Sequence, residues 1–309
     1  MAAIALLGDI NIDLLLEIPA YPVEGGEAIA SAQTTSLGGS ATNTAITLAR
    51  LGFETRLLGR IGDDLWGQRA LADLSAAGVR TDWITRDPAE PTQLNLVMVA
   101  GSGERTMFAY RGANAQLGPD QVVPSLFENV VLLHLSGYSF LRSPQADAAR
   151  LAIEMAGSRA IPVTLDIPAG VVGQIAASVL PLLDRIDTIL LGQADLDGLG
   201  VTAPTLLQRG VRRVALKRGA AGSVLYEAGG ETAVDGFTAP AVDTTGAGDA
   251  FAAGQIAGLL GGLDGHACCR LANALGAAAV TRRGAGLAMP GPQDIDAFLG
   301  PGSSRLVKA

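Results

Sequence analysis

Short apolar runs alternate with longer amphipathic stretches along most of this chain, and this alternation limits its fold more than any other feature. The apolar runs are rich in Val, Ile and Leu, which is typical of strands buried on both faces of a sheet. They are residues 3–7, 55–58, 130–135, 163–166, 188–191 and 214–217. Between them, apolar residues recur at helical spacing in residues 42–51, 65–77, 144–156 and around 206–208. The alternation predicts an α/β fold with three layers, α/β/α, in which helices cover both faces of a mainly parallel central sheet.

Two segments, residues 10–37 and 92–110, interrupt the alternation. The first mixes alternating Leu or Ile and polar residues with Pro19 and Pro22, and the second alternates on both sides of a Gly101-Ser102-Gly103 turn. Such a pattern is typical of hairpin strands. It predicts either one small β-layer outside the parallel sheet or, equally well, an antiparallel extension of that sheet. We expect residues 1–309 to form a single domain that contains both segments.

The charge and the rare residue types exclude several classes of function. The chain has 22 Lys and Arg against 30 Asp and Glu, a net charge of −8, and no basic cluster, so a nucleic-acid-binding surface is not expected. Its two cysteines, Cys268 and Cys269, are neighbours, which favours reduced thiols in a cytoplasmic protein over a disulfide. Two histidines exclude a site with several histidine ligands. The longest uncharged stretches are shorter than the roughly 20 apolar residues of a membrane span, and the first residues lack the basic region of a signal peptide.

Two glycine-rich turns lead into predicted helices. Residues 243–251, DTTGAGDAF, open a helix over 250–260, and residues 36–45, SLGGSATNTA, lead into another. Small residues allow a ligand close to the backbone, and the first free N–H groups of a helix can bind an anion. Asp249 would lie in the first helical turn, where the helix end favours the ionised form that a general base needs. Alternatively, the threonines cap the helix and Asp249 only complements its dipole.

Together with Gly8-Asp9-Ile10-Asn11-Ile12-Asp13, these turns resemble the PfkB, or ribokinase-like, family of carbohydrate kinases. Residues 38–52 are similar to the first family motif and residues 243–254 to the second. Shorter segments at 59–67, 111–115 and 217–222 also fit, in the family's order, so the resemblance covers essentially the whole chain. A G-x-x-x-x-G-K-[ST] loop is missing, and so is a G-x-G-x-x-G after the first strand, which removes the main support for P-loop and Rossmann interpretations.

The resemblance implies an ATP-dependent kinase that transfers the γ-phosphate to a hydroxyl, expected to be primary, of a small sugar or sugar acid, with Mg²⁺ bridging the phosphates. Asp249 would be the catalytic base, next to an anion hole formed by Gly246, Ala247 and Gly248. The resemblance also assigns residues to binding roles. The acceptor would be bound by Asn11, Asp13, Gly38, Gly39 and Asn43. The nucleotide would be bound by Lys217, Gly219 and Gly222. A monovalent cation such as K⁺ would be bound by Asp243 and Thr245.

Three positions depart from the family pattern. Ser40 stands where ribokinases carry a lysine, and Ser136 where they place an acidic residue, and both differences argue against ribose as the acceptor. The N-x-x-E motif that the family associates with magnesium and phosphate reads Gly192-Gln193-Ala194-Asp195, so that only the carboxylate of Asp195 remains. This segment therefore departs from the family pattern for metal binding, whereas the assignment of the base does not depend on it.

Arg111 could bind the carboxylate of a sugar acid, whereas we interpret Arg105 as a solvent-exposed surface residue. His134 lies in an apolar run and is interpreted as a core residue. The resemblance further implies that residues 10–37 and 92–110 form a lid over the acceptor and that the lid can pair two subunits as a homodimer. A nucleoside kinase of the same family is the nearest alternative, and a catalytically inactive ligand-binding relative is the other.

Overall fold

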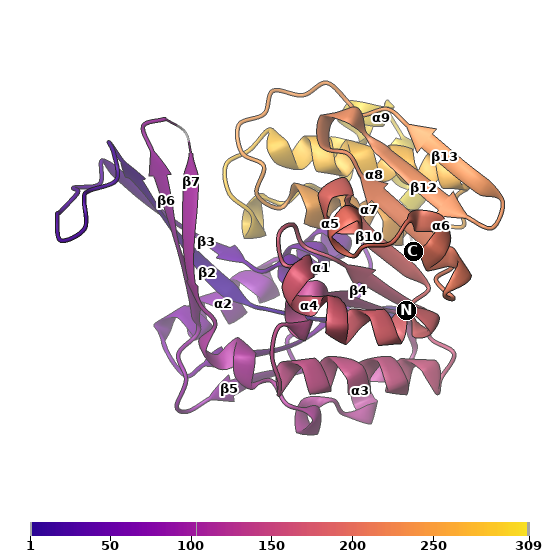
Figure 1. The fold of residues 1–309 in the computed structure, drawn as a ribbon, viewed down its shortest axis with the longest axis horizontal. Helices are drawn as coiled ribbons and strands as arrows, with labels where there is room; N and C mark the ends of the chain where they lie inside the picture. Colours follow the sequence, from indigo (N-terminus) through magenta and orange to yellow (C-terminus); the bar gives the residue numbers. More distant parts are fainter. Residues whose placement is uncertain (1, 103, 308–309) are drawn as a thin grey trace.

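The computed structural model describes residues 2–102 and 104–307, and in these residues nine strands form one large sheet (Figure 1). The strand order is β13-β12-β11-β10-β9-β8-β1-β4-β5. Strands β11 to β5 in this order pair in parallel, while β12 and β13 continue the sheet antiparallel. The strands are Ala3–Leu7 (β1), Glu54–Gly62 (β4), Ile84–Asp87 (β5), Val130–Ser136 (β8), Val163–Asp166 (β9), Thr188–Gly192 (β10), Arg213–Lys217 (β11), Ser223–Glu227 (β12) and Gly230–Val234 (β13).

Helices cover both faces of this sheet, so the predicted three-layer α/β/α fold is confirmed. In β1, Ala3, Ala5 and Leu7 pack with the core on one side, and Ile4 and Leu6 pack with the core on the other, as the period of a strand requires. Helices α3 to α6 cover the first side, and α1, α2, α7, α8 and α9 cover the second. The helices are Ser40–Arg50 (α1), Leu65–Ala76 (α2), Gln145–Gly157 (α3), Val172–Val179 (α4), Gln193–Gly198 (α5), Ala203–Gln208 (α6), Ala247–Leu260 (α7), Gly265–Val280 (α8) and Pro292–Leu299 (α9).

The six predicted apolar runs all became strands of the large sheet, whereas β5, β12 and β13 were not predicted. Strands β13 and β5 are the two edge strands of the sheet, and β12 lies next to β13. Edge strands are partly exposed, and β13 is buried only at Val234. Strands β5 and β13 therefore lack the continuous apolar runs by which buried strands are recognised, and in β12 that run is short, Val224-Leu225-Tyr226.

The two segments that interrupt the alternation form a separate four-stranded sheet, which we call the lid sheet, in the order β3-β2-β6-β7. It projects from one side of the large sheet (Figure 1). A small β-layer is therefore the correct choice between the two alternatives. The strands of the lid sheet are Asn11–Ile18 (β2), Ala32–Gly38 (β3), Gln93–Ala100 (β6) and Arg105–Tyr110 (β7).

The cysteines and His134 lie in the core, as predicted. Cys268 and Cys269 are buried and free, and burial raises the pKa of Cys268 to about 12. Burial lowers the pKa of His134 to about 3, so this histidine is neutral, with Nδ1 2.9 Å from the Thr164 hydroxyl. Among residues 2–102 and 104–307, no helix combines the length and the apolar character that crossing a bilayer needs.

Candidate active site

The carboxyl ends of five parallel strands meet the lid sheet at a cavity of about 560 Å³, which we call the lid cavity. Asp9 follows β1, Tyr138 follows β8, and Asp166, Gly192 and Lys217 end β9, β10 and β11, and all five line the cavity. Strand β1 lies between β4 and β8, so the chain crosses to opposite sides of β1. Open α/β sheets bind ligands at the carboxyl ends of strands where the order reverses in this way.

Asp249 lies in the first turn of α7 and lines the lid cavity. Its Oδ1 accepts a hydrogen bond from the Ser40 hydroxyl at 2.8 Å, and its Oδ2 accepts one from the Asn43 side-chain amide at 2.7 Å. Burial raises the pKa of Asp249 to about 6, and these two hydrogen bonds act in the opposite direction. The carboxylate is therefore held by two donors in one orientation, and it is ionised at neutral pH.

Lys217, at the end of β11, lies beside the start of α7. Its Nζ is 2.5 Å from Oδ1 of Asp166 at the end of β9, and a Cβ added to Gly248 would lie 3.4 Å from that Nζ. Burial raises the pKa of Asp166, while the charge of Lys217 and its hydrogen bond lower it. The pair places a positive charge next to the free N–H groups at the helix start.

The inner face of the lid sheet presents carboxamides and one carboxylate to the lid cavity. Asp13 Oδ1 accepts hydrogen bonds from the side-chain amides of Asn11 and Asn95, both at 2.8 Å, and Gln93 donates to Asn95 at 3.0 Å. All four residues line the cavity. Burial raises the pKa of Asp13 to about 6 against the effect of the two amides. Donors and acceptors of this kind suit a ligand with several hydroxyl groups.

Two glycines immediately before α1 have no side chain and therefore leave room for the Asp13 side chain and for the backbone at Asp9. A Cβ on Gly38 would lie 2.4 Å from Oδ2 of Asp13, and a Cβ on Gly39 would lie 2.0 Å from the Asp9 carbonyl oxygen. Gly39 also has a φ of 109°, a conformation that residues with a side chain rarely adopt. The Gly38-Gly39 turn is thus required for the close packing of α1, β1 and the lid.

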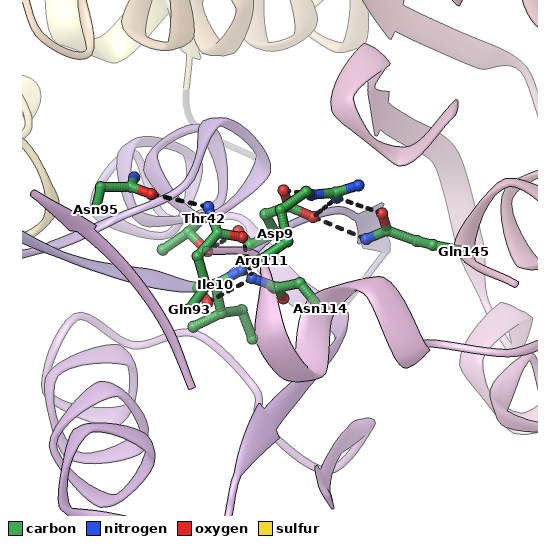
Figure 2. Close-up of polar contacts among 8 residues, drawn as sticks. All are labelled: Asp9, Ile10, Thr42, Gln93, Asn95, Arg111, Asn114 and Gln145. Atoms are coloured by element: carbon green, nitrogen blue, oxygen red, sulfur yellow. Dashed lines mark hydrogen bonds and ion pairs between the residues drawn. The ribbon is translucent and has the colours of Figure 1, made fainter. Parts of the chain in front are cut away.

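Figure 2 shows a polar network around Asp9. Arg111 Nη2 lies 2.7 Å and 2.8 Å from the two Asp9 carboxylate oxygens, and Gln145 donates to Asp9 Oδ1 at 2.8 Å. The Asn114 amide bonds both the N–H and the C=O of Ile10. Arg111 lines the lid cavity, and its Nε and Nη1 are buried without a hydrogen-bond partner among the described residues. Buried donors of this kind are rare in folded proteins.

A second cavity, of about 320 Å³, continues from the first between the β11–β12 turn and helices α7 and α8, and we call it the α7–α8 cavity. The two cavities share three lining residues, Lys217, Thr244 and Gly248. The second cavity is lined mainly by small and apolar residues, including Gly219, Gly222, Phe237, Phe251 and Ala277. One ligand in each cavity would therefore meet the other at the start of α7.

A further cavity, of about 640 Å³, lies at the other end of β9 and β10. Four of its charged residues form two ion pairs: Arg185 lies 3.4 Å from Glu154, and Arg212 lies 3.2 Å from Asp187. Of these four side chains all but that of Asp187 are largely exposed, and none belongs to the predicted site residues. It is an ion-paired surface groove away from the carboxyl ends of the strands.

Residues 1–292 match the sequence profile of the pfkB family carbohydrate kinases. The chain belongs to this family. It is an ATP-dependent carbohydrate kinase. The ATP-dependent ribose-1-phosphate kinase of Halopiger xanaduensis is 33% identical over 306 residues, which cover 97% of this chain and 98% of that protein. The 2-dehydro-3-deoxygluconokinase of Thermoproteus tenax is 29% identical, with 85% of each chain covered.

A solved structure agrees with the family assignment. The structure of Arabidopsis thaliana ribokinase complexed with ribose and ATP superposes with a TM-score of 0.82 and 27% sequence identity. The superposition covers 96% of this chain and 98% of that chain. The ribokinase-like fold expected from the resemblance is thus confirmed over nearly the whole kinase.

The structure brings most of the predicted site residues of the kinase together. Those in the lid cavity are Asn11, Asp13, Gly39, Asn43, Arg111, Asp195, Lys217, Thr245, Gly246, Gly248 and Asp249. Those in the α7–α8 cavity are Lys217, Gly219, Gly222, Ala247 and Gly248. Gly38 packs against Asp13, and neither it nor Asp243 lines a cavity.

The interpretation of Arg105 as a plain surface residue is incomplete. Its side chain is 35% exposed, but Nη2 lies 2.7 Å from Asp243 Oδ1, and Nη1 donates to the Thr245 hydroxyl at 2.8 Å. Asp243 is distant in sequence, so nothing around Arg105 indicates this pairing.

Sequence reasoning also missed several residues that line the lid cavity of the kinase. Asp166 had a usable signal, because it ends an apolar run that was predicted to be a parallel strand. Gln93 and Asn95 are two residues apart on β6, but their side of the strand depends on pairing with β2. Gln145 does not line the cavity itself but bonds Asp9, which does, and it had no signal in the sequence.

Proposed function

We propose that this kinase transfers the γ-phosphate of ATP to a hydroxyl of a small sugar that carries a negatively charged group, with Asp249 as the general base. The observation that carries this proposal is the position of the Asp249 carboxylate. It lines the lid cavity one residue after Gly248, where that cavity joins the α7–α8 cavity. We place the acceptor in the lid cavity and ATP in the α7–α8 cavity, with the reacting groups at the start of α7.

The surroundings of Asp249 suit proton removal from an acceptor hydroxyl. Each carboxylate oxygen accepts one hydrogen bond, from Ser40 or Asn43, and retains capacity for another acceptor bond. A pKa of about 6 leaves Asp249 ionised at neutral pH and keeps it more basic than an ordinary aspartate. Since Ser40 replaces the lysine of ribokinases, the hydroxyl that orients the base is a feature of this chain.

The negative charge of the transferred phosphoryl group would be stabilised at the helix start. We assign the anion hole to Gly246, Ala247 and Gly248, whose N–H groups precede the first helical hydrogen bonds. The Ala247 N–H also donates to the Thr244 carbonyl at 3.3 Å, a long bond that an anion could replace. Lys217 adds a formal positive charge beside Gly248.

Asp195 and Asp166 are the residues that would hold Mg²⁺ together with the phosphates. No group of three or more His, Cys, Asp or Glu side chains is arranged for a metal in the described part of the chain. Mg²⁺ commonly binds through one or two carboxylates, substrate phosphates and water, so these two residues fit such an ion. Both line the lid cavity, and Asp195 also accepts a hydrogen bond from the Gly170 N–H at 3.0 Å. When bound, the ion would neutralise phosphate charge.

Arg111 favours an acceptor with a carboxylate or phosphate group. Its Nη2 is paired with Asp9, while its Nε and Nη1 are buried without partners among the described residues, so a shift of the side chain toward the cavity would let oxygens of an anionic acceptor satisfy both donors with charge-assisted hydrogen bonds. Two of the relatives are named for such acceptors, ribose 1-phosphate and a deoxygluconate. The amides around Asp13 would bind the hydroxyl groups of the same molecule.

An acceptor screen tests the proposal. ADP release is measured with ribose, ribose 1-phosphate, fructose, 2-dehydro-3-deoxygluconate and adenosine. We expect the highest kcat/KM for an anionic sugar, and we expect Arg111→Gln to lose that preference. A preference for adenosine would identify a nucleoside kinase instead. Thermal stabilisation by a sugar without any ADP release would identify a binding protein.

We also propose that the outer face of the lid sheet pairs two subunits. Leu14 on β2, Leu96 on β6 and Phe108 on β7 lie opposite one another in the strand register and face away from Asp13. Phe108 is 57% exposed, and an apolar row of this kind needs cover. Light scattering should give a dimer for the native chain and a monomer for Phe108→Glu. A native monomer would contradict the pairing.

A further inference from the structure

Arg105 connects the lid sheet to the loop that precedes helix α7. It is the first residue of β7, an edge strand of the lid sheet (Figure 1), and this strand is exposed along its whole length. It shares a strand face with Met107 and Ala109, which line the lid cavity. Its guanidinium bonds Asp243 at 2.7 Å and Thr245 at 2.8 Å. Arg105 is therefore an exposed lid residue whose charged end is fixed on a loop of the main body.

Asp243 is a fixed negative charge in that loop. Its side chain is only 4% exposed, Oδ1 accepts the Thr245 N–H at 2.8 Å, and Oδ2 accepts the Gly284 N–H at 2.9 Å. Burial alone would raise the pKa of Asp243, but the hydrogen bonds from Gly284, Thr245 and Arg105 outweigh it and lower that pKa to about 2. The carboxylate thus carries its charge at every working pH, and Arg105 is its positively charged partner.

The residues that the family resemblance assigns to a monovalent cation do not fit one while Arg105 is in place. The guanidinium already occupies an acceptor site on Asp243 Oδ1 and on the Thr245 hydroxyl. An ion bound through the same two oxygens would lie against a second positive charge in a partly buried place. The Arg105 guanidinium, which belongs to the lid sheet, therefore already supplies a positive charge to this loop.

We propose that Arg105 supplies from the lid the positive charge that a monovalent cation would otherwise supply at Asp243 and Thr245. Closing the lid then also fixes the loop in front of the anion hole, and the kinase works without K⁺. Arg105 is a positioning residue, because it acts through the loop and lines neither cavity. The inference rests on the proposed function in assigning phosphate binding to the start of α7.

The chain offers a matched control. Arg283 also joins the main body to the lid sheet, with Nη1 3.1 Å from Oε1 of Glu17 on β2. Its side chain is 79% exposed. The pair leaves Asp243 untouched, and an exposed ion pair of this kind contributes little. Arg283→Gln therefore removes a bridge to the lid without removing the charge at Asp243.

The experiment compares the wild type, Arg105→Gln, Arg105→Lys and Arg283→Gln, with K⁺ replaced by tetramethylammonium at constant ionic strength. For the wild type, Arg105→Lys and Arg283→Gln, kcat/KM should change less than about twofold with K⁺. Without K⁺, the kcat/KM of Arg105→Gln should be lower than that of the wild type by about tenfold or more, which is in the range typical of coupled sites. Adding K⁺ should restore kcat/KM to the wild-type value. A wild type that needs K⁺, or an Arg105→Gln variant indifferent to K⁺, would overturn the inference.

Thermal unfolding without sugar or ATP provides a second readout. K⁺ should raise the Tm of Arg105→Gln relative to tetramethylammonium and leave the wild-type Tm unchanged, because only the variant has a vacant charge site. A K⁺-specific shift in the wild type overturns the inference even if Arg105→Gln fails to fold. Failure of the proposed function is distinct from this: it would appear as full activity in Asp249→Asn, which leaves the K⁺ measurements as they are.

Discussion

The two cavities that meet at Gly248 are lined by different types of residue. The lid cavity is lined by polar and charged side chains from many segments, among them Asp13, Asn95 and Arg111. The α7–α8 cavity is lined mostly by glycine, alanine and apolar residues, with Lys217 as its charged member. The first can recognise a ligand through its functional groups, and the second mainly through the shape of its backbone.

This difference has a consequence for specificity in the kinase. Replacing one amide or carboxylate in the lid cavity changes which hydroxyls find a partner, so the acceptor can change without changing the fold. The α7–α8 cavity has few side chains to exchange, and only added bulk would alter it strongly. We therefore expect substitutions to separate the two ligands, except at the residues where the cavities join.

Asp249→Asn is expected to have the largest effect, since it acts at the junction on the chemistry itself. We predict that kcat falls by about 10²–10⁴-fold, the usual contribution of a general base, while ATP binding hardly changes. The amide keeps the size of the side chain. Steady-state ADP release and binding of a non-hydrolysable ATP analogue measure the two quantities. A correctly folded variant with wild-type kcat would remove Asp249 from the mechanism.

Asp13→Ala should affect one cavity only. It leaves the amides of Asn11 and Asn95 without their acceptor and, in the acceptor site that we propose, removes a partner of the sugar hydroxyls. Loss of such buried hydrogen bonds costs about 1–3 kcal/mol, so kcat/KM for the sugar should fall by about 5- to 150-fold. Affinity for the ATP analogue, measured without sugar, should be unchanged. Equal losses for both ligands would mean that Asp13 supports the fold.

Ala277→Leu is the reciprocal change in the other cavity. Ala277 lies on α8 and lines the α7–α8 cavity, and a larger side chain would occupy space that the nucleotide needs. Overpacking costs about 1–3 kcal/mol, and at the lower end of this range we expect KM for ATP to rise about tenfold. Sugar affinity, measured by calorimetry without nucleotide, should remain at the wild-type value, which makes Asp13→Ala and Ala277→Leu controls for each other. An unchanged KM for ATP would place the nucleotide elsewhere.

The same contrast explains which parts of the kinase could be predicted from sequence. The Asp249 turn and the Gly38-Gly39 turn are continuous in sequence, so their spacing already indicates a helix start and a close backbone approach. The six inner parallel strands were also predictable, because they are buried on both faces, whereas the parallel edge strand β5 was not. Arg105 with Asp243, and Gln145 with Asp9, are pairs joined only by folding and strand register. No periodicity in the chain encodes such pairs.

The prediction with the smallest expected effect concerns how the hydrogen bond from Ser40 sets the pKa of Asp249. Because the pKa of Asp249 is about 6, kcat should be constant above neutral pH and decline as the pH falls through 6, where the base becomes protonated. Ser40 donates to the ionised form of Asp249, so Ser40→Ala should raise that pKa and move the acid limb upward. A hydrogen bond worth about 1 kcal/mol corresponds to a shift of about 0.7 pH unit.

At pH 8 the Ser40→Ala variant should retain nearly the wild-type kcat, and its affinity for the ATP analogue should not change. A pH-independent loss of activity would instead mean that the Ser40 hydroxyl contacts the acceptor directly. The pH profile thus separates tuning of the base from recognition of the sugar, and both occur on the lid side of the junction.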